Sequence, residues 1–214
     1  MFIHASIILI AICTGGAVFA LDNPDRVGRY EEVKFGLPVI PESREAIYDY
    51  YRLCFMVDMT PGRYVDNICR EHPMYAAYLM GDYLNQYKKS GDILQLRAAE
   101  NILNNAVSNM HQSKNALIYY FTPESVVTAV TGKHYSGLTQ SNYLKYTTQL
   151  YQITKNKKYK EIARKLFNSI TLSENSGGVA KYTDHGAHIK EYQTEYDGWT
   201  LNGWITAINN IFYY

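Results

Sequence analysis

The sequence predicts an all-α fold, an incomplete (α/α) toroid of helical hairpins that follows an extended N-terminal lead-in. Apolar residues recur at helical spacing from residue 43 onward, and one helix-turn-helix pattern occurs twice. Arrays of such paired helices close into toroids or stack as solenoids. The 214 residues are 47% hydrophobic and 19% charged, so one domain with a sizeable core is expected over residues 43–214.

Residues 1–20 are typical of a secretory signal peptide. An apolar run from Ile7 to Ile12 is followed by small residues up to Ala20, and the run is too short for a membrane span. We expect a protein that is secreted, periplasmic or in the lumen of the secretory pathway, with an uncleaved N-terminal anchor as the alternative. Residues 21–42 contain three prolines and little periodicity, which predicts the extended lead-in.

Start and stop signals predict the individual helices. Ser43 is a plausible N-cap for a first helix whose apolar stripe reaches Cys54. After a break at residues 60–62, a second helix is expected from Pro73 to Ser90, because proline suits the first helical turn. Its partner is expected from Asp92 to about Met110, which completes one helical hairpin.

A second hairpin is predicted by internal similarity. A shift of 65 residues sets Tyr78 on Tyr143, Gly91 on Asn156 and Ala98 on Ala163. In both copies a residue that tolerates positive φ is expected to close the turn, and a small residue is expected at the helix contact. A last helix is expected from about Gly198 to the end of the chain.

Two segments between the helices are more typical of function than of scaffold. Residues 117–123 are aromatic and extended in character, and residues 177–198 are long, polar and rich in Gly, His, Tyr and acids. A connection as long as the second is usually either a binding loop or disordered. Both segments are therefore candidates for contacts with a ligand.

Cys54 and Cys69 remain after removal of the signal peptide. In an oxidising compartment a bond between them would close a loop worth about 3 kcal/mol of stability. Two buried free thiols are the alternative. Their spacing matches no zinc or redox motif, so neither a metal nor a cofactor is predicted.

The near-zero net charge argues against partners that are attracted by the overall charge of a protein, such as nucleic acids. With 21 basic and 20 acidic side chains the net charge is +1, so we expect no nucleic-acid partner, and a polyanion would have to be met by a local patch. The chain also holds 21 tyrosines, whose rings stack on sugars and whose hydroxyls form hydrogen bonds. Ordinary helix packing is the other explanation of this excess.

The strongest group of chemically active residues falls between positions 190 and 203. Carboxylates, phenols and an indole gather there just before a predicted helix. Proton transfer on a sugar needs an acid or base, a second group of different pKa and a stacking surface, and this segment offers all three. A solvated loop that caps the helix through Asp197 is the alternative.

Part of this segment resembles a known signature. Glu191-Tyr192-Gln193-Thr194, six further residues and Leu201-Asn202-Gly203-Trp204 are similar to Glu-Tyr-Pro-Thr, six residues and Leu-Asn-Gly-aromatic in the C-terminal domain of the D-glucuronyl C5-epimerases. Upstream, residues 137–141 and 177–179 are similar to a helix opening and a Gly-Val turn of that family. Weaker similarity reaches back to His72-Pro73 and Tyr78, so the resemblance covers residues 72–214.

The resemblance implies a uronic-acid polysaccharide as partner and inversion at C5, of the D-glucuronate to L-iduronate type. In that family a proton is removed from C5 and one is returned from the other face. Tyr192 and Glu191 would be an acid/base residue and its partner, and Gln140 and Asn202 would hold the sugar. From the residues themselves we add these substrate contacts: Tyr120, Tyr196, Trp199 and Lys181. Lys181 and Lys190 are candidates for neutralising the substrate carboxylate.

Two departures from the family pattern affect the expectation. Gln193 stands where the family has proline, which is expected to loosen the turn that aims Tyr192. The family also carries further catalytic Tyr and Arg residues beyond this point, whereas the sequence given ends at Tyr214. We therefore expect a fragment, a missing group supplied by the Tyr-rich N-terminal half, or a protein that binds uronate chains without inverting them.

Two readings other than epimerisation stay open. A polysaccharide lyase of similar fold shares the proton abstraction, and a non-catalytic or truncated glycan-binding protein would share only the cleft. His185 and His188 could ligate a metal, but the sequence offers no third ligand near them. The sequence also leaves open whether the chain forms a homodimer.

Overall fold

The computed structural model describes residues 26–29, 52–56, 60–65, 67–113, 115–123, 130, 132–193 and 200–214. The expected signal peptide, Tyr196 and Trp199 lie outside these residues, and of the expected lead-in only residues 26–29 are described. No helix in the described part of the chain is both long enough and apolar enough to cross a bilayer. In chain order the elements are β1 (Arg26–Arg29), β2 (Leu53–Met56), β3 (Pro61–Val65), β4 (Ile68–Glu71), α2 (Pro73–Ser90), α3 (Ile93–Asn109), β5 (His111–Ser113), β6 (Ala116–Ile118), β7 (Tyr120–Phe121), β8 (His134–Tyr135), α4 (Gly137–Thr154), α5 (Lys157–Ile170), a 3-10 turn (Glu174–Ser176), β9 (Ala180–Thr183), β10 (Gly186–Ile189) and α6 (Leu201–Tyr213).

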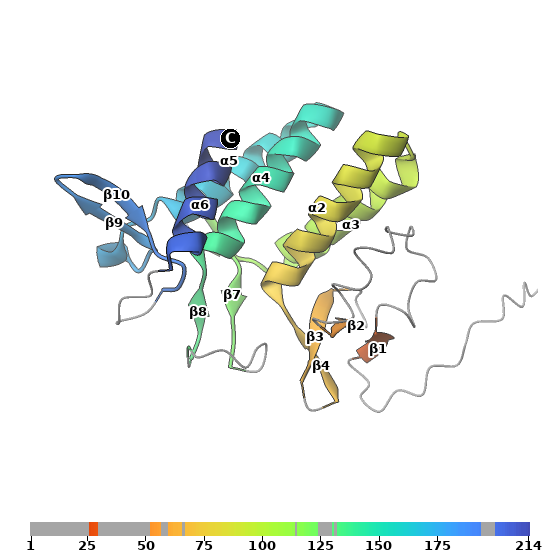
Figure 1. Cartoon of the computed structure of the whole chain (residues 1–214), viewed down its shortest axis with the longest axis horizontal. Coiled ribbons are helices and arrows are strands. Elements are labelled where there is room, and N and C mark those ends of the chain that lie inside the picture. Colours follow the sequence, from red (N-terminus) through yellow and green to blue (C-terminus); the bar gives the residue numbers. More distant parts are fainter. Residues whose placement is uncertain are drawn as a thin grey trace, which may run out of the picture.

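The fold is mixed α and β, so the prediction of an all-α toroid was wrong. Five α-helices occur in the described residues together with four small antiparallel sheets, one of four strands and three of two. Figure 1 shows α2, α4 and α6 alongside one another, with α3 behind α2 and α5 behind α4, and with β3–β4 and β7–β8 below the lower ends of α2 and α4. Strands of two to five residues are too short to leave an alternating pattern in the sequence, which is why only the helical periodicity stood out.

Both predicted helical hairpins are present. Pro73 begins α2, Gly91 closes it with φ 70°, and the Asp92 side chain caps α3 by accepting from the backbone N–H of Leu94 at 2.9 Å. In the second hairpin Lys155 takes the left-handed conformation, with φ 56°. Asn156 instead caps α5, so the structural repeat is 64 residues (155 minus 91) rather than 65.

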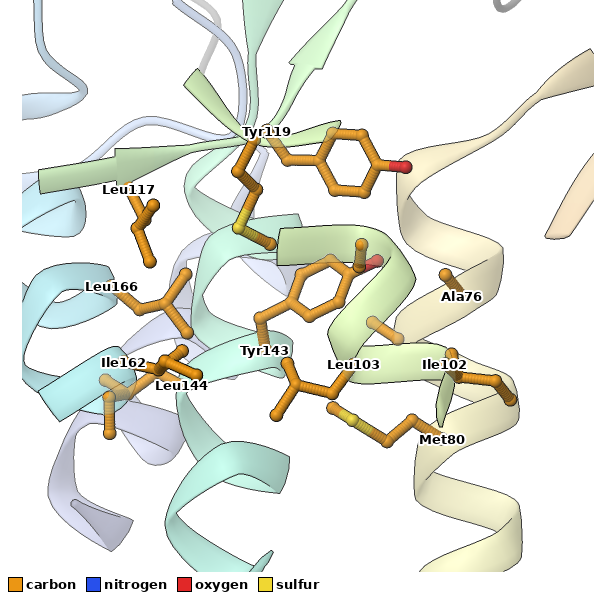
Figure 2. Packing of buried hydrophobic residues seen from close by; sticks show 14 of the residues in the cluster. Ala76, Met80, Ile102, Leu103, Leu117, Tyr119, Tyr143, Leu144, Ile162 and Leu166 are labelled. Atoms are coloured by element: carbon orange, nitrogen blue, oxygen red, sulfur yellow. The ribbon is translucent and has the colours of Figure 1, made fainter. Parts of the chain in front are cut away.

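The helices are held by one continuous apolar core. α2 packs on α3 and α4, and α4 also packs on α5 and α6. Figure 2 shows Met80 of α2, Leu103 of α3, Tyr143 and Leu144 of α4 and Leu166 of α5 meeting between the helices. All five are fully buried, and each such side chain contributes about 1.5–3 kcal/mol.

Tyrosines occupy much of this interior. The largest fully buried side chains include Tyr83, Tyr119, Tyr135 and Tyr143. The Tyr143 hydroxyl donates to the Pro73 carbonyl at 2.8 Å, which ties α4 to the start of α2. Helix packing therefore accounts for part of the tyrosine excess.

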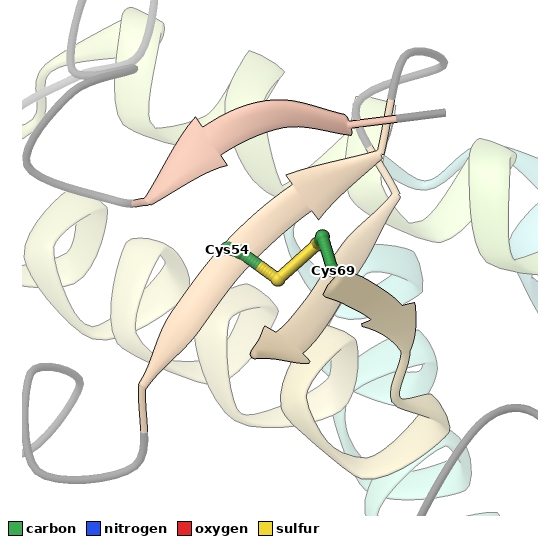
Figure 3. Close-up of a disulfide and its surroundings, with 2 residues drawn as sticks. All are labelled: Cys54 and Cys69. Atoms are coloured by element: carbon green, nitrogen blue, oxygen red, sulfur yellow. A yellow bond between two sulfur atoms is a disulfide. The ribbon is translucent and has the colours of Figure 1, made fainter. Parts of the chain in front are cut away.

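Cys54 lies in strand β2, so the predicted helix does not extend to this residue; positions 43–51 are outside the described part. Cys54 and Cys69 form a disulfide, one of the two alternatives that the sequence allowed, with their Cα atoms 5.9 Å apart. Figure 3 shows this bond joining β2 to β4. Gly62 in β3 faces it, and a side chain there would overlap the Arg70 carbonyl and lie 3.1 Å from the Cys69 sulfur.

Removing this disulfide is expected to destabilise the protein. A double variant, Cys54→Ser with Cys69→Ser, should lower the free energy of unfolding by about 3 kcal/mol, because the unfolded chain regains the entropy of a loop of this length. Denaturant titration monitored by circular dichroism measures the change. Reductant should lower the stability of the wild type to that of the double variant and leave the variant unchanged; equal stability of the two oxidised proteins would contradict the prediction.

Candidate active site

A cleft of about 540 Å³ opens where the start of α2 approaches the start of α4. This volume is within the range of small-molecule sites and suits a sugar unit. One side comes from β3, the residue after β4 and α2, and the other from β7, the start of α4 and the segment after β10. The lining residues are Arg63, His72, Met74, Tyr75 and Tyr78 on the first side and Phe121, Ser136, Leu138, Thr139, Glu191 and Tyr192 on the second.

Backbone pairing holds Glu191 and Tyr192 at the start of α4. The Gly137 N–H donates to the Glu191 carbonyl at 3.0 Å, and Ser136 and Tyr192 form an antiparallel bridge. Position 137 has to be glycine for this approach, because a Cβ there would overlap the Lys190 carbonyl. The two residues that the family resemblance singled out therefore enter the cleft from a fixed backbone.

Gln193 holds the same turn instead of loosening it. Its backbone N–H donates to the Tyr135 carbonyl at 2.9 Å, a bond that a proline lacks a hydrogen to make. Its side-chain amide donates to the Gly177 carbonyl. The turn that precedes the undescribed residues 194–199 is thus tied to two separate parts of the chain.

The Glu191 carboxylate lies against the first turn of α6. Gly203 makes room for it, since a Cβ at that position would overlap a Glu191 carboxylate oxygen and the Thr200 hydroxyl. The same carboxylate forms a side-chain hydrogen bond with the Tyr192 phenol. The glycine of the Leu-Asn-Gly signature therefore has a steric reason that involves the neighbouring carboxylate.

The Tyr192 phenol is held in its protonated form. Burial raises its pKa to about 12, and the hydrogen bond with Glu191, the Glu191 charge and the Tyr78 phenol act in the same direction. A tyrosine acts as a base only when its pKa is lowered. At neutral pH this arrangement therefore suits proton donation.

Arg63 and His72 give the other side of the cleft its chemical character. Among the described lining residues Arg63 carries the positive charge, and no described residue forms an ion pair with it. His72 stacks on Tyr75 with ring centroids 3.8 Å apart. Burial, and after it the Arg63 charge, lower the pKa of His72 to about 3, so its imidazole is neutral.

A series of ring contacts connects His72 to Tyr192. The Phe121 ring meets His72 edge-on at 5.7 Å and stacks on His134 at 5.3 Å. His134 in turn contacts the Tyr192 ring at 5.9 Å. Of the two rings between them only Phe121 lines the cleft, where it offers an apolar face of the kind that stacks on sugars.

Two residues predicted to hold the sugar lie elsewhere. Gln140 is fully buried, and its amide bonds the Tyr119 N–H, the Leu117 carbonyl at 2.6 Å and the Ser169 hydroxyl at 2.7 Å. Asn202 is exposed on the first turn of α6. Neither is among the residues lining the cleft, and the roles predicted for them stay predictions.

The other predicted contacts that the structure describes do not line the cleft either. Tyr120 of β7 is half-buried beneath Lys133, whose ammonium lies 4.3 Å from the ring centre. Lys181 is exposed on β9, and Lys190 is buried in an ion pair with Glu174. Tyr196 and Trp199 belong to the undescribed stretch after Gln193.

The histidines considered as metal ligands sit on the β9–β10 hairpin. His185 is exposed in its turn, and His188 stacks on Trp204 with ring centroids 5.9 Å apart. Within the described ranges no three metal-type side chains come together.

Sequence reasoning missed most of the first side of the cleft. Arg63 belongs to no motif, and His72 and Tyr78 were noticed only as weak extensions of the resemblance. The disulfide-linked sheet brings Arg63 beside His72, whose N–H donates to the Pro61 carbonyl at 3.2 Å. That contact depends on strand pairing, which the sequence did not reveal.

Part of the chain, including one side of the cleft, is similar to a domain of the carbohydrate-epimerase type. The family model described as D-glucuronyl C5-epimerase C-terminus matches residues 113–213, which confirms the resemblance drawn from the sequence. No curated protein and no solved structure matches the chain. Glu191 and Tyr192 lie within the matched segment, and Arg63, His72 and Tyr78 precede it.

Proposed function

We propose that this protein epimerises C5 of uronic acid residues in a polysaccharide, of the D-glucuronate to L-iduronate type. The observation that carries the proposal is the Tyr192 phenol, hydrogen-bonded to Glu191, in a sugar-sized cleft that also holds an arginine. The match of this segment to the glucuronyl C5-epimerase family supports the same chemistry. The disulfide agrees with export to an oxidising compartment.

Arg63 would neutralise the substrate carboxylate. The hydrogen on C5 of a uronate is very weakly acidic, and it can be removed only if the adjoining carboxylate is stabilised as negative charge moves onto it. A guanidinium can hold both carboxylate oxygens at once. Arg63 lines the cleft, so in this proposal it takes the role first considered for Lys181 and Lys190.

Tyr192 would return the proton to C5. The enediolate formed by abstraction is far more basic than a phenolate, so a phenol whose pKa is raised to about 12 still protonates it. Glu191 accepts from the Tyr192 hydroxyl and would keep it aimed at the sugar. Tyr78 and Phe121 would provide stacking surfaces in the cleft.

The polysaccharide would extend beyond the cleft. Sugar units on either side of the reacting uronate need contacts outside the lining residues, because only one unit undergoes inversion. In this proposal those outer contacts fall to the aromatic and polar residues predicted from the sequence: Tyr120, Lys181, Tyr196, Trp199 and Asn202.

Inversion in deuterated water tests the proposal. The wild type, given a glucuronate polysaccharide of the heparosan type, should form the inverted epimer with deuterium at C5. Tyr192→Phe should lower this conversion by at least about 10²-fold, the usual contribution of a general acid. NMR of the digested product measures both isomer and label.

Tyr182→Phe is the matched control, because Tyr182 is exposed on the β9–β10 hairpin and should leave conversion unchanged. Absence of inverted product from folded wild-type protein would defeat the proposal. Appearance of the ultraviolet absorbance of an unsaturated uronate would point to a lyase. Binding without any exchange at C5 would indicate a glycan-binding protein.

A further inference from the structure

Exposed lysines gather at the end of the helices opposite the cleft. α2 and α4 both begin at the cleft, have 18 residues each and pack against each other, so both end about 27 Å away from it. Figure 1 shows the two helices running upward, away from β3–β4 and β7–β8. The lysine cluster at this end consists of Lys88, Lys89, Lys155, Lys157, Lys158 and Lys160.

Contacts between the two hairpins hold this cluster together. The Lys88 ammonium at the end of α2 donates to the side-chain oxygen of Gln149 in α4 at 2.9 Å. The Lys158 ammonium at the start of α5 donates to the side-chain oxygen of Asn104 in α3, also at 2.9 Å. Both partners are neutral amides, and no described residue forms an ion pair with any lysine of the cluster. The positive charges are therefore held in place without being neutralised.

The acidic residues of the same helices have other partners. Glu161 forms an ion pair with Arg164 at 2.6 Å. Asp92 caps α3, and Glu100 accepts from the Tyr159 hydroxyl at 2.8 Å. Although the whole chain has a net charge of +1, this end of the domain carries a local excess of positive charge.

The positions of these lysines do not favour the stability of the fold. Lys157, Lys158 and Lys160 occupy the first turn of α5, which contains no acidic residue. The helix dipole is positive there, so cations in that turn destabilise the helix. Burial and the nearby charge of Lys145 lower the pKa of Lys88, which shows that the charges also repel one another across the helices. A bound anion would offset both effects.

A hollow next to the cluster indicates which kind of anion fits. It has a volume of about 230 Å³ and lies between α4, α5 and the end of α6, with Tyr151, Gln152 and Lys160 in its lining. The Lys160 ammonium lies 6.0 Å from the centre of the Tyr151 ring. An aromatic ring, an amide and an ammonium around a hollow suit the ring and the acid group of a sugar. A flat lipid surface would leave the hollow empty.

We infer that the lysine cluster and this hollow form a second binding site, which takes an anionic polysaccharide about 27 Å from the cleft. The identity of the ligand rests on the proposed function. A uronate polysaccharide supplies both a series of carboxylates for the lysines and sugar rings for the hollow. A long chain held at this site stays attached while another of its uronates enters the cleft, which raises the effective concentration of substrate there.

Binding of a heparosan-type polysaccharide at several salt concentrations tests the inference. Lys157→Gln combined with Lys160→Gln should weaken binding at low salt by at least about fivefold, the cost of two exposed charge contacts. The dependence of affinity on salt should also become less steep, because fewer counterions are released. Isothermal titration calorimetry measures both. The same double variant should unfold roughly 2 °C higher, since two cations leave the positive end of α5.

A second double variant, Arg52→Gln with Lys165→Gln, removes the same charge outside the lysine cluster and should bind as the wild type does. In kinetics the cluster variant should raise KM for a long polysaccharide and leave kcat unchanged. Its KM for a short oligosaccharide that fills only the cleft should equal that of the wild type. This difference would not arise from a purely structural role of the lysines.

Unchanged binding in the cluster variant, or an equal loss in the control variant, would overturn the inference. So would binding of single-stranded DNA as tightly as a polysaccharide of equal charge, because DNA would then show a surface for polyanions in general. Absence of inversion by the wild type would defeat the proposed function. Binding is measured without turnover and would still decide whether the second site exists.

Discussion

Arg63→Met should lower kcat/KM for a uronate polysaccharide by about 10²–10³-fold, the cost of losing one preorganised group that stabilises developing negative charge. The methionine side chain keeps much of the apolar stem of arginine but cannot bind the carboxylate. Arg63 is half-buried on β3 and no described residue pairs with it, so its replacement leaves no opposite charge stranded there. The loss should therefore appear in kinetics while the unfolding transition stays near that of the wild type.

Two comparisons sharpen this expectation. Arg63→Lys should recover only part of the activity, because an ammonium is a point charge and lacks the planar fork of a guanidinium. Arg97→Met, on the exposed face of α3, should have no effect.

In Arg63→Met the pKa of His72 should also rise, since the Arg63 charge is the second cause of its lowering; NMR titration of the imidazole measures this. An unchanged kcat/KM would remove Arg63 from the site.

Gln140→Leu is expected to lower the free energy of unfolding by about 3 kcal/mol. The substitution leaves the Tyr119 N–H, the Leu117 carbonyl and the Ser169 hydroxyl without their amide partner in a buried place. Each buried polar group left unsatisfied costs about 1–3 kcal/mol, and local relaxation recovers part of the sum. Denaturant titration measures the loss, and residual activity should fall only in proportion to the folded fraction.

Asn202→Ala is the matched comparison, because both amides were predicted to hold the sugar. Asn202 is exposed, so its truncation should change stability by no more than about 0.5 kcal/mol. If Gln140 contacted substrate instead, Gln140→Leu would raise KM and leave stability nearly unchanged. That outcome would reverse the assignment made from its hydrogen bonds.

Local signals in the sequence predicted the helical hairpins well. Pro73 favours a helix start through its fixed φ, and Asp92 through a cap hydrogen bond to the first turn of the helix. Both residues lie at the helix starts where they were expected. The second turn was misplaced by one residue, because Asn156 tolerates positive φ but also caps helices, and here it caps α5. A residue with two suitable roles cannot be assigned without knowing its neighbours in space.

The sequence predicted some residues of the candidate site but not the surroundings of others. Glu191 and Tyr192 are adjacent in sequence and carry a signature, so the sequence alone brought them together, and the structure adds the cleft around them. The predicted role of Gln140 came from the resemblance, whereas its burial follows from packing between α4 and the segment before β7. Burial depends on all neighbouring elements, so a motif does not reveal it.

By itself the sequence determined the helical hairpins, the relation to the epimerase family and the adjacent carboxylate and phenol of positions 191 and 192, because all of these are local in the chain. Only the tertiary structure decided that short strands accompany the helices, that Cys54 and Cys69 are joined, and that Arg63 and His72 line one cleft with Tyr192. Those pairings connect residues that are distant in sequence. Their free energy arises from burial and hydrogen bonds that exist only once the chain has folded.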